Sequence, residues 1–268
     1  MNPRAPLIEI EHAEVYRGET RVFGDLSLRI EQGGHTAILG PNGSGKSTLL
    51  RLLTRELYPV AREGSWVRIL GIERWDVFEL RRQLGVVSHE LQMHYTQTVR
   101  GVDVVLSGFF ASVGIGYHSH LQPTPEQRAR AVQVLHELGA TQLAKKPIGA
   151  MSAGEQRRCL LGRALVHDPS ALVLDEPTTS LDLKARFELI ALVRKLVNRG
   201  KTLILVTHHV DEIPPEVTRV VLLREGRVIA DGLKSDILTS ERLSHLFDTK
   251  MHLLEQNGFF QSVPDFDA

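Results

Sequence analysis

The sequence lacks the features that are typical of membrane-spanning, secreted and strongly nucleic-acid-binding proteins. Its single cysteine, Cys159, excludes an intrachain disulfide and suits a reducing compartment. No apolar run approaches the roughly 18 to 20 residues needed to span a bilayer, and residues 1–11 lack the basic and apolar blocks of a signal peptide. The 32 basic and 32 acidic residues cancel, which argues against a strongly basic nucleic-acid binder. We therefore expect a chain that is soluble by itself and reaches a membrane only through a partner.

The chain does contain a glycine-rich loop of the kind that holds the phosphates of a nucleotide. Its glycines let successive backbone N–H groups point inward at phosphate oxygens. Lys46 adds a positive charge, and the hydroxyl of Ser47 suits a magnesium ion. An apolar strand over residues 35–39 precedes the loop and a helix over residues 48–53 follows it, which is the setting that the motif requires. The residues expected to bind phosphate are Gly40, Pro41, Asn42, Gly43, Ser44, Gly45, Lys46, Ser47 and Thr48.

An acid pair follows a second apolar strand. Asp175 and Glu176 come directly after residues 172–174, at the strand end where ligands bind in open α/β sheets. Asp175 can hold magnesium through a water, and Glu176 can polarise the water that attacks the terminal phosphorus. The competing interpretation is a helix N-terminus or a solvated turn.

Two further segments have both a functional and a structural interpretation. His208 follows the apolar strand 202–206 and can donate a hydrogen bond to a terminal phosphate, although a histidine after a strand is more often structural. Ser152 and Glu155 have the spacing of a capping box at the start of a helix that is expected to end near Asp168-Pro169, and such a start is also an anion site. The pair His118 and His120 has no convincing metal-ligand spacing and is expected in a polar loop.

The order of the patterns predicts an α/β fold of the P-loop NTPase class with a mostly parallel core sheet. Residues 7–15 and 26–30 alternate apolar and polar side chains, so we expect an N-terminal antiparallel β subdomain. Residues 98–150 have a mainly helical pattern, which predicts an inserted helical subdomain. After about residue 168, apolar strands alternate with helices, as in a buried parallel sheet.

These patterns predict a single domain over residues 1–268. Residues of about 1–90 and 160–245 would form the catalytic core with the β subdomain, and about 91–159 the helical subdomain. Residues of about 246–268 would form a hairpin and tail, because Asn257-Gly258 between two strand-like runs is a strong hairpin signal.

With these motifs in this order, the chain resembles the ATP-binding subunits of ABC transporters over nearly its whole length. Ser152-Ala153-Gly154-Glu155-Gln156 is similar to the family signature Ser-Gly-Gly-Gln-Gln, and Ser180-Leu181-Asp182 to the loop that crosses between subunits. His208 matches the switch histidine, and Tyr16 matches the aromatic residue that stacks on adenine. The resemblance implies ATP hydrolysis with Mg²⁺, in which Lys46, Glu176 and His208 are catalytic, Ser152, Gly154 and Asp182 bind nucleotide, and Ser47 and Asp175 hold the metal.

The chain departs from the family pattern at two places. Ala153 and Glu155 replace the usual glycine and glutamine, but Ser152 and Gly154 are retained. At His89 the resemblance expects a glutamine that touches magnesium. A neutral imidazole is a poor ligand for this hard cation, so His89 could instead bond the attacking water or a phosphate. Gln92 could substitute if the register shifts, and a third possibility is that neither residue takes this part.

The resemblance also implies partners. A second ATPase subunit, most simply a copy of this chain, would face the first head to tail, and separate permease subunits would hold the pair on the cytoplasmic face of a membrane. Residues 102–108 and the C-terminal hairpin are similar to subunits for metal-chelate and molybdate uptake, which favours an importer with a solute-binding protein. An exporter, or a soluble regulatory, ribosome-associated or DNA-associated ABC ATPase, is the alternative. No nucleic-acid partner is expected, and Glu176 with His208 disfavours a sensor without hydrolysis.

Overall fold

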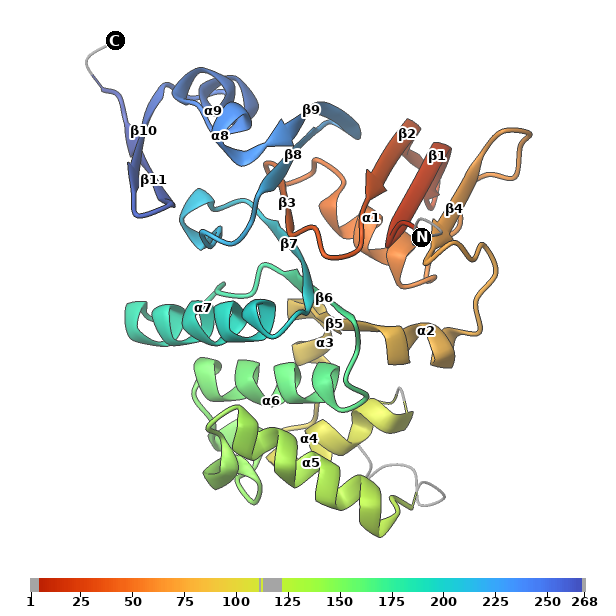
Figure 1. Cartoon of the computed structure of the whole chain (residues 1–268), viewed down its shortest axis with the longest axis vertical. Coiled ribbons are helices and arrows are strands. Elements are labelled where there is room, and N and C mark those ends of the chain that lie inside the picture. The colour runs from red at the N-terminus through yellow and green to blue at the C-terminus, as the bar shows by residue number, and fades with distance from the viewer. Residues whose placement is uncertain (1–4, 111, 113–121, 267–268) are drawn as a thin grey trace. The chain divides into compact units, whose positions relative to one another are not determined.

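The computed structural model describes residues 5–110, 112 and 122–266, which fall into two compact units. The first unit comprises residues 1–77 and 202–268, and the second comprises residues 78–201. In Figure 1 the first unit has the colours of both ends of the scale, and the second has the middle colours. Each unit contains part of the motif set.

A small antiparallel sheet opens the first unit. Strand β1 (Ile8–Arg17) lies between β2 (Thr20–Ile30) and β4 (Trp66–Ile69), and both neighbours run antiparallel to it. Alternate residues of β1, including Ile8 and Ile10, are buried, as the alternating sequence pattern predicted. The expected N-terminal antiparallel β subdomain is therefore confirmed.

The remaining large strands of the first unit are mostly parallel. Strand β3 (Thr36–Leu39) pairs in parallel with β7 (Thr202–Thr207) and β8 (Arg219–Arg224), and β9 (Arg227–Leu233) is antiparallel to β8. Every residue of β3 and β7 is buried, which is typical of parallel strands covered on both faces. Helix α1 (Lys46–Leu53) follows β3 after a short loop.

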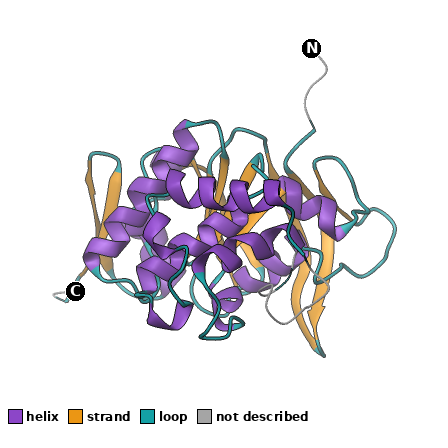
Figure 2. Ribbon diagram, turned by 90° about the horizontal axis from the view of Figure 1, so that it is seen from below, coloured by secondary structure: helices purple, strands orange, loops and turns teal. Residues whose placement is uncertain are grey.

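A hairpin closes the described chain. Helices α8 (Lys234–Ile237) and α9 (Ser240–Phe247) lead to strands β10 (Met251–Gln256) and β11 (Phe259–Pro264), which pair on either side of Asn257-Gly258. Figure 2 shows this pair of strands near the C-terminus. The ammonium group of Lys234 donates to the carbonyl oxygens of Pro214, Pro215 and Gly258 at 3.3, 3.2 and 3.1 Å. This one side chain therefore joins the hairpin turn to the segment before β8.

The second unit is mainly helical around two parallel strands. Strands β5 (Leu84–Val87) and β6 (Ala171–Asp175) pair in parallel. Helices α4, α5 and α6 pack on one another, and α4 and α5 lie within residues 98–150, where a helical pattern was predicted. The helices are α2 (Val77–Gln83), α3 (His89–Met93), α4 (Gly101–Leu106), η1 (Ser107–Phe110), α5 (Pro125–Glu137), η2 (Thr141–Leu143), η3 (Ile148–Ala150), α6 (Ala153–Leu165) and α7 (Leu183–Asn198).

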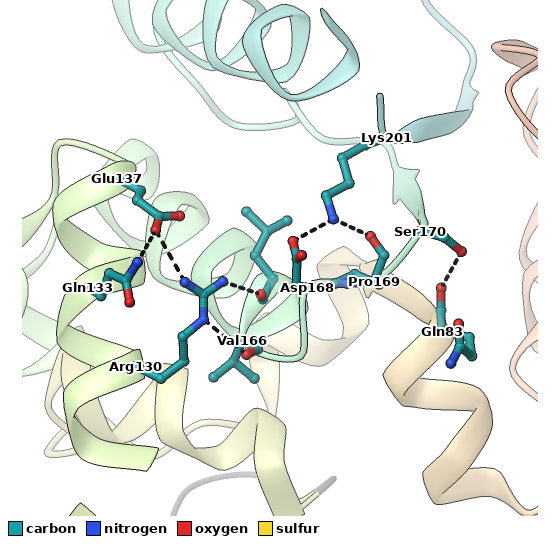
Figure 3. Close-up of polar contacts among 10 residues, drawn as sticks. Gln83, Arg130, Gln133, Glu137, Val166, Asp168, Pro169, Ser170 and Lys201 are labelled. Atoms are coloured by element: carbon teal, nitrogen blue, oxygen red, sulfur yellow. Dashed lines mark hydrogen bonds and ion pairs between the residues drawn. The ribbon is translucent and has the colours of Figure 1, made fainter. Parts of the chain in front are cut away.

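Helix α6 ends earlier than the sequence pattern predicted, at Leu165 rather than near Asp168. The guanidinium of Arg130, from α5, donates to the carbonyl oxygens of Leu165 and Val166 at 3.5 and 3.4 Å (Figure 3). Asp168 then takes a left-handed conformation with φ of 54°, which a helix cannot continue. A side chain from another helix thus satisfies carbonyls that the end of α6 leaves free.

No helix in the described ranges 5–110 and 122–266 is long and apolar enough to cross a membrane.

Candidate functional site

The glycine-rich loop starts at the edge of the parallel strands of the first unit. Leu39 of β3 lies in register with Thr207 of β7, and the N–H of Gly40 donates to the carbonyl of Thr207 at 3.3 Å. A side chain at position 40 would place its Cβ only 2.2 Å from the carbonyl oxygen of Leu223. Glycine is therefore required at the start of the loop, because the backbone of β8 passes too close for any other residue.

Helix α1 presents an uncapped N-terminus to this loop. Its N-cap residue, Gly45, is left-handed and offers no side-chain hydrogen bond to the first turn. The first N–H groups of a helix have no partner within the helix and carry a partial positive charge, so they favour an anion. The exposed side chain of Ser47 lies in the same first turn.

Lys46 places a buried positive charge inside the loop. Its side chain is only 6% exposed, and its ammonium group donates to the carbonyl oxygens of Gly40 and Pro41 at 2.8 and 2.9 Å. The buried hydroxyl of Ser44 has no hydrogen-bond partner among the described residues. A cation, an unsatisfied hydroxyl and a free helix start are the donors that phosphate oxygens need, so the loop fits the phosphates of a nucleotide.

Tyr16 lies on β1 of the same unit with 41% of its surface exposed. Its hydroxyl donates to Glu14 Oε1 at 3.1 Å, and this hydrogen bond raises the pKa of the phenol above its ordinary value. This hydrogen bond holds the hydroxyl of Tyr16 and leaves its aromatic ring exposed, and an exposed ring can stack on a planar base.

The segment after β7 is held by a pair of buried residues that the sequence did not indicate. The hydroxyl of Thr207 donates to the carboxylate of Glu212, which is 2% exposed, and accepts the backbone N–H of His209 at 3.0 Å. His208 lies between these two bonded positions, and its ring centroid is 3.9 Å from that of His209. The signal that the sequence offered was an acid five residues after an apolar strand, but a single acid in a polar stretch is too common to be singled out.

In the second unit, the acid pair lies at the end of β6. Asp175 is the last residue of the strand, and Glu176 follows it with φ of 45°, in the left-handed region. The carbonyl of Glu176 accepts the N–H of Thr179 at 3.3 Å. The backbone therefore turns directly after the strand, at the acid pair.

Helix α6 begins with the capping box that the sequence predicted. The hydroxyl of Ser152 accepts the N–H of Glu155 at 3.3 Å, and the Glu155 carboxylate accepts the N–H of Ser152 at 2.8 Å. Lys146 donates to the same carboxylate at 2.6 Å, and this bond lowers the pKa of Glu155. A Cβ at Gly154 would lie 2.9 Å from the Cβ of Ala185, so glycine lets the start of α6 approach α7 closely.

Helix α3 contains the two candidates for the missing glutamine. Ser88 caps this helix by accepting the N–H of Leu91 at 3.2 Å, and His89 is the first helical residue. The prediction for the His89 side chain lies outside what the structure describes. The amide of Gln92 donates to Oε1 of Gln156, on α6, at 2.6 Å. The amide nitrogen of Gln156 in turn donates to the carbonyl of Ile148 at 2.9 Å. The amide of Gln92 is therefore bonded to α6.

Asp182, from the loop that resembles the family's intersubunit loop, caps α7. Its carboxylate accepts the N–H of Ala185 at 2.8 Å. Ser180, two residues earlier, is left-handed with φ of 67°. The predictions for His118 and His120 lie outside the described residues.

The structure thus gathers the predicted residues into two sets. The first unit holds the phosphate loop, Tyr16 and His208. The second unit holds Asp175 and Glu176, the capped start of α6 and Asp182.

Comparison with known proteins identifies the family. Residues 23–179, more than half of the chain, match the family described as ABC transporter. The chain belongs to the ABC transporter family. This ABC ATPase is 33% identical over 253 residues to an uncharacterised ABC transporter ATP-binding protein of Bacillus subtilis strain 168, which covers 92% of this chain and 93% of that protein. It is also 31% identical to a hemin import ATP-binding protein of Rhodopseudomonas palustris strain BisB18 (90% and 88% covered) and 34% identical to a cobalt import ATP-binding protein of Rhodobacter capsulatus (84% and 77% covered).

Solved structures agree with the sequence relatives. A metal-chelate type ABC transporter in an inward-facing conformation matches this ABC ATPase with a TM-score of 0.77 and 25% identity, covering 98% of both chains. A dimeric ATP-binding cassette bound to ADP and Pi matches with a TM-score of 0.69 and 26% identity, covering 84% of this chain and 98% of that chain. The predicted P-loop ATPase fold is confirmed, and the chain is an ATP-binding and ATP-hydrolysing subunit of a transporter family. ABC ATPases act as dimers with membrane permease subunits.

Proposed function

We propose that this ABC ATPase drives the import of a solute, with a metal ion or a metal chelate as the cargo class. The observation that carries this proposal is the likeness to hemin and cobalt import ATPases together with the metal-chelate type transporter. The C-terminal hairpin is present as strands β10 and β11, and its pattern is similar to that of uptake subunits. Export and soluble, transport-free ATPase activity are the alternatives that an experiment must separate.

In this proposal the phosphate loop binds ATP through its backbone, and Lys46 binds the outer phosphates. Ser47 and Asp175 hold Mg²⁺, which when bound neutralises charge on the phosphate oxygens. The described residues contain no group of three or more His, Cys, Asp or Glu that could hold a metal. Such a group is not needed here, because Mg²⁺ at a nucleotide is held by one or two protein oxygens and the phosphates themselves.

Glu176 accepts a proton from the attacking water, and His208 donates a hydrogen bond to the terminal phosphate. The strained backbone at Glu176 and the bonded positions on either side of His208 support these roles, because both fix a side chain before the reaction begins.

Two copies of the chain face head to tail in the proposed working state. Ser152 and Gly154 of one copy complete the nucleotide site of the other, while Asp182 lies in the loop that crosses between copies. The place of Ser152 as the N-cap of α6 supports this role, because a helix start attracts phosphate. Tyr16 stacks on adenine, and His89 contacts the attacking water or a phosphate.

The decisive test of hydrolysis and closure is the variant Glu176→Gln, which keeps the size of the side chain and removes the base. We expect ATP turnover to fall by about 10² to 10⁴ while ATP binding is retained, since general bases contribute that much to rate. With ATP and Mg²⁺ the variant should elute as a dimer in size-exclusion chromatography. Glu19→Gln, at an exposed position in the β1–β2 turn, is the matched control. Unchanged turnover, or a variant that stays monomeric, would contradict the proposal.

The direction of transport, the membrane partner and the location of the chain are tested together in cells. We propose that the chain lies on the cytoplasmic face of the membrane, bound to a permease, with a solute-binding protein outside. Cells without the chain should lose uptake of hemin or Co²⁺, and wild type but not Glu176→Gln should restore it. A permease should co-purify from detergent extracts. Loss of efflux would favour an exporter, and a chain that co-purifies with ribosomes or DNA in place of a permease would favour the soluble alternative.

A further inference from the structure

A second pocket lies in the first unit, on the segment between α1 and α2. Its volume is about 570 Å³, within the range of pockets that hold small molecules. Three arginines and one glutamate line it, and one of the arginines, Arg62, forms ion pairs with acids outside the lining. Both tryptophans of the chain, Trp66 and Trp75, line it as well, together with Tyr58. None of the residues assigned to nucleotide binding or hydrolysis belongs to this lining.

Arg55 is a buried positive charge without a counter-ion. Its side chain is 6% exposed, yet it forms no ion pair with any described carboxylate. Its described hydrogen bond runs from Nη2 to the carbonyl of Val67 at 2.6 Å, and its Nε has no partner. Burial lowers the pKa of Arg55, and Glu73 acts on its charge only from beyond ion-pair distance. A buried cation is costly unless an anion compensates it.

A pocket in the second unit shows how the chain itself can compensate such charges. It has a volume of about 190 Å³ and is also lined by several cations, at the ends of α5, α6 and α7. There Arg130 pairs with Glu137 at 3.2 Å, and Lys201 pairs with Asp168 at 2.6 Å (Figure 3). The chain supplies acids within ion-pair distance at that pocket but none within that distance of Arg55, which suggests that the anion comes from outside.

The remaining donors and rings around Arg55 define what kind of anion fits. Ser65 Oγ and Trp66 Nε1 are buried and have no hydrogen-bond partner among the described residues. Arg74 is exposed and has no described ion pair. Tyr58 is 62% exposed beside Arg55, whose guanidinium carbon lies 6.0 Å from the ring centroid. Unsatisfied donors require acceptor oxygens, and an exposed aromatic ring stacks on a flat ring.

We propose that this pocket binds a small phosphorylated or carboxylated molecule that carries a flat ring, with a nucleoside monophosphate as its simplest example. Arg55 and Arg74 bind the anionic group, Ser65 and Trp66 donate to its oxygens, and Tyr58 stacks on the ring. The pocket shares no lining residue with the ATP site, so it binds a second ligand in the first unit.

Tryptophan fluorescence is a direct readout, since both tryptophans of the chain line this pocket. The full-length protein is titrated with AMP, with inorganic phosphate and with adenosine. We expect AMP to change the emission with saturation, and phosphate and adenosine each to bind at least about tenfold more weakly, because each lacks half of the contacts. No saturable change with AMP would overturn the proposal. Equal binding of phosphate and AMP would overturn the part that assigns a ring.

Substitutions locate the signal. Arg55→Met should weaken AMP binding about tenfold or more, and Arg74→Met and Tyr58→Ala should each weaken it several-fold. The last two positions are exposed, so these variants test the proposal even if Arg55→Met fails to fold. Arg227→Met, an exposed arginine on β9, is the matched control and should bind AMP normally. Lys46→Ala should also retain the AMP signal. Loss of the signal in Lys46→Ala would assign it to the phosphate loop and overturn the proposal, as would normal binding in all three pocket variants.

Discussion

Single side chains determine how the segment after β7 is held. Thr207 and Glu212 are both buried, and the hydroxyl of Thr207 bonds both to Glu212 and to the N–H of His209. This hydroxyl is thus the link between the strand end and the turn that carries His208. The backbone on both sides of His208 is thus held by hydrogen bonds, which is what its proposed contact with a phosphate requires.

Thr207→Val tests this link, because valine has the same shape without the hydroxyl. We expect the free energy of unfolding to fall by about 1 to 3 kcal/mol, since the buried Glu212 carboxylate and the His209 N–H each lose a partner. Urea denaturation measures this change, and steady-state kinetics should show a lower kcat for ATP. Thr20→Val, at an exposed position at the start of β2, is the control. A variant as stable and as active as wild type would show that the link is not needed.

At the scale of elements, the start of α6 could be predicted from the sequence and its end could not. The capping box at Ser152 was predicted because both of its bonds join residues three positions apart. The end of α6 was not, since Arg130 reaches its last carbonyls from another helix. The phosphate loop and the Asn257-Gly258 hairpin were likewise local patterns. The Gln92–Gln156 bond joins residues far apart in the chain, and no periodicity encodes such a pairing.

The start of α6 should respond to pH through Glu155. The hydrogen bond from Lys146 lowers the pKa of this carboxyl below its ordinary 4.5, so its charge contributes stability above that pH. Glu155→Gln should therefore be less stable than wild type near neutral pH. The difference should shrink as the pH falls through the lowered pKa, where the wild-type carboxyl also becomes neutral. Urea midpoints from neutral pH to about pH 3 measure this, with Glu19→Gln as the control. A difference that does not change with pH would contradict the assignment.

For the whole molecule, the two compact units each have a buried apolar interior. The first is built on β3 and β7, whose side chains are all buried, and the second on β5, β6 and the packed helices α4, α5 and α6. Burying a large apolar side chain contributes about 1.5 to 3 kcal/mol, so interiors of this kind are the main source of stability in both units. The single cysteine of the chain lies on α6, so its reactivity reports on the second unit.

Cys159 should report the opening of the second unit. The side chain is fully buried, and burial raises the pKa of its thiol to about 12. A thiol-specific reagent at mildly alkaline pH should therefore label the folded protein at least about a thousandfold more slowly than the denatured chain. Mass spectrometry follows the single label, and the same protein in concentrated urea is the control. Rapid labelling under native conditions would show that α6 opens far more readily than its burial indicates.

The three carbonyls that converge on Lys234 have a consequence for how this chain varies among its relatives. The ammonium group bonds to Pro214, Pro215 and Gly258, so the hairpin turn supplies one of the three acceptors of a lysine at this position. A lineage that loses β10 and β11 also loses part of the selection that preserves Lys234, and a lineage that replaces the lysine weakens the attachment of the hairpin. The lysine and the hairpin should therefore be inherited together.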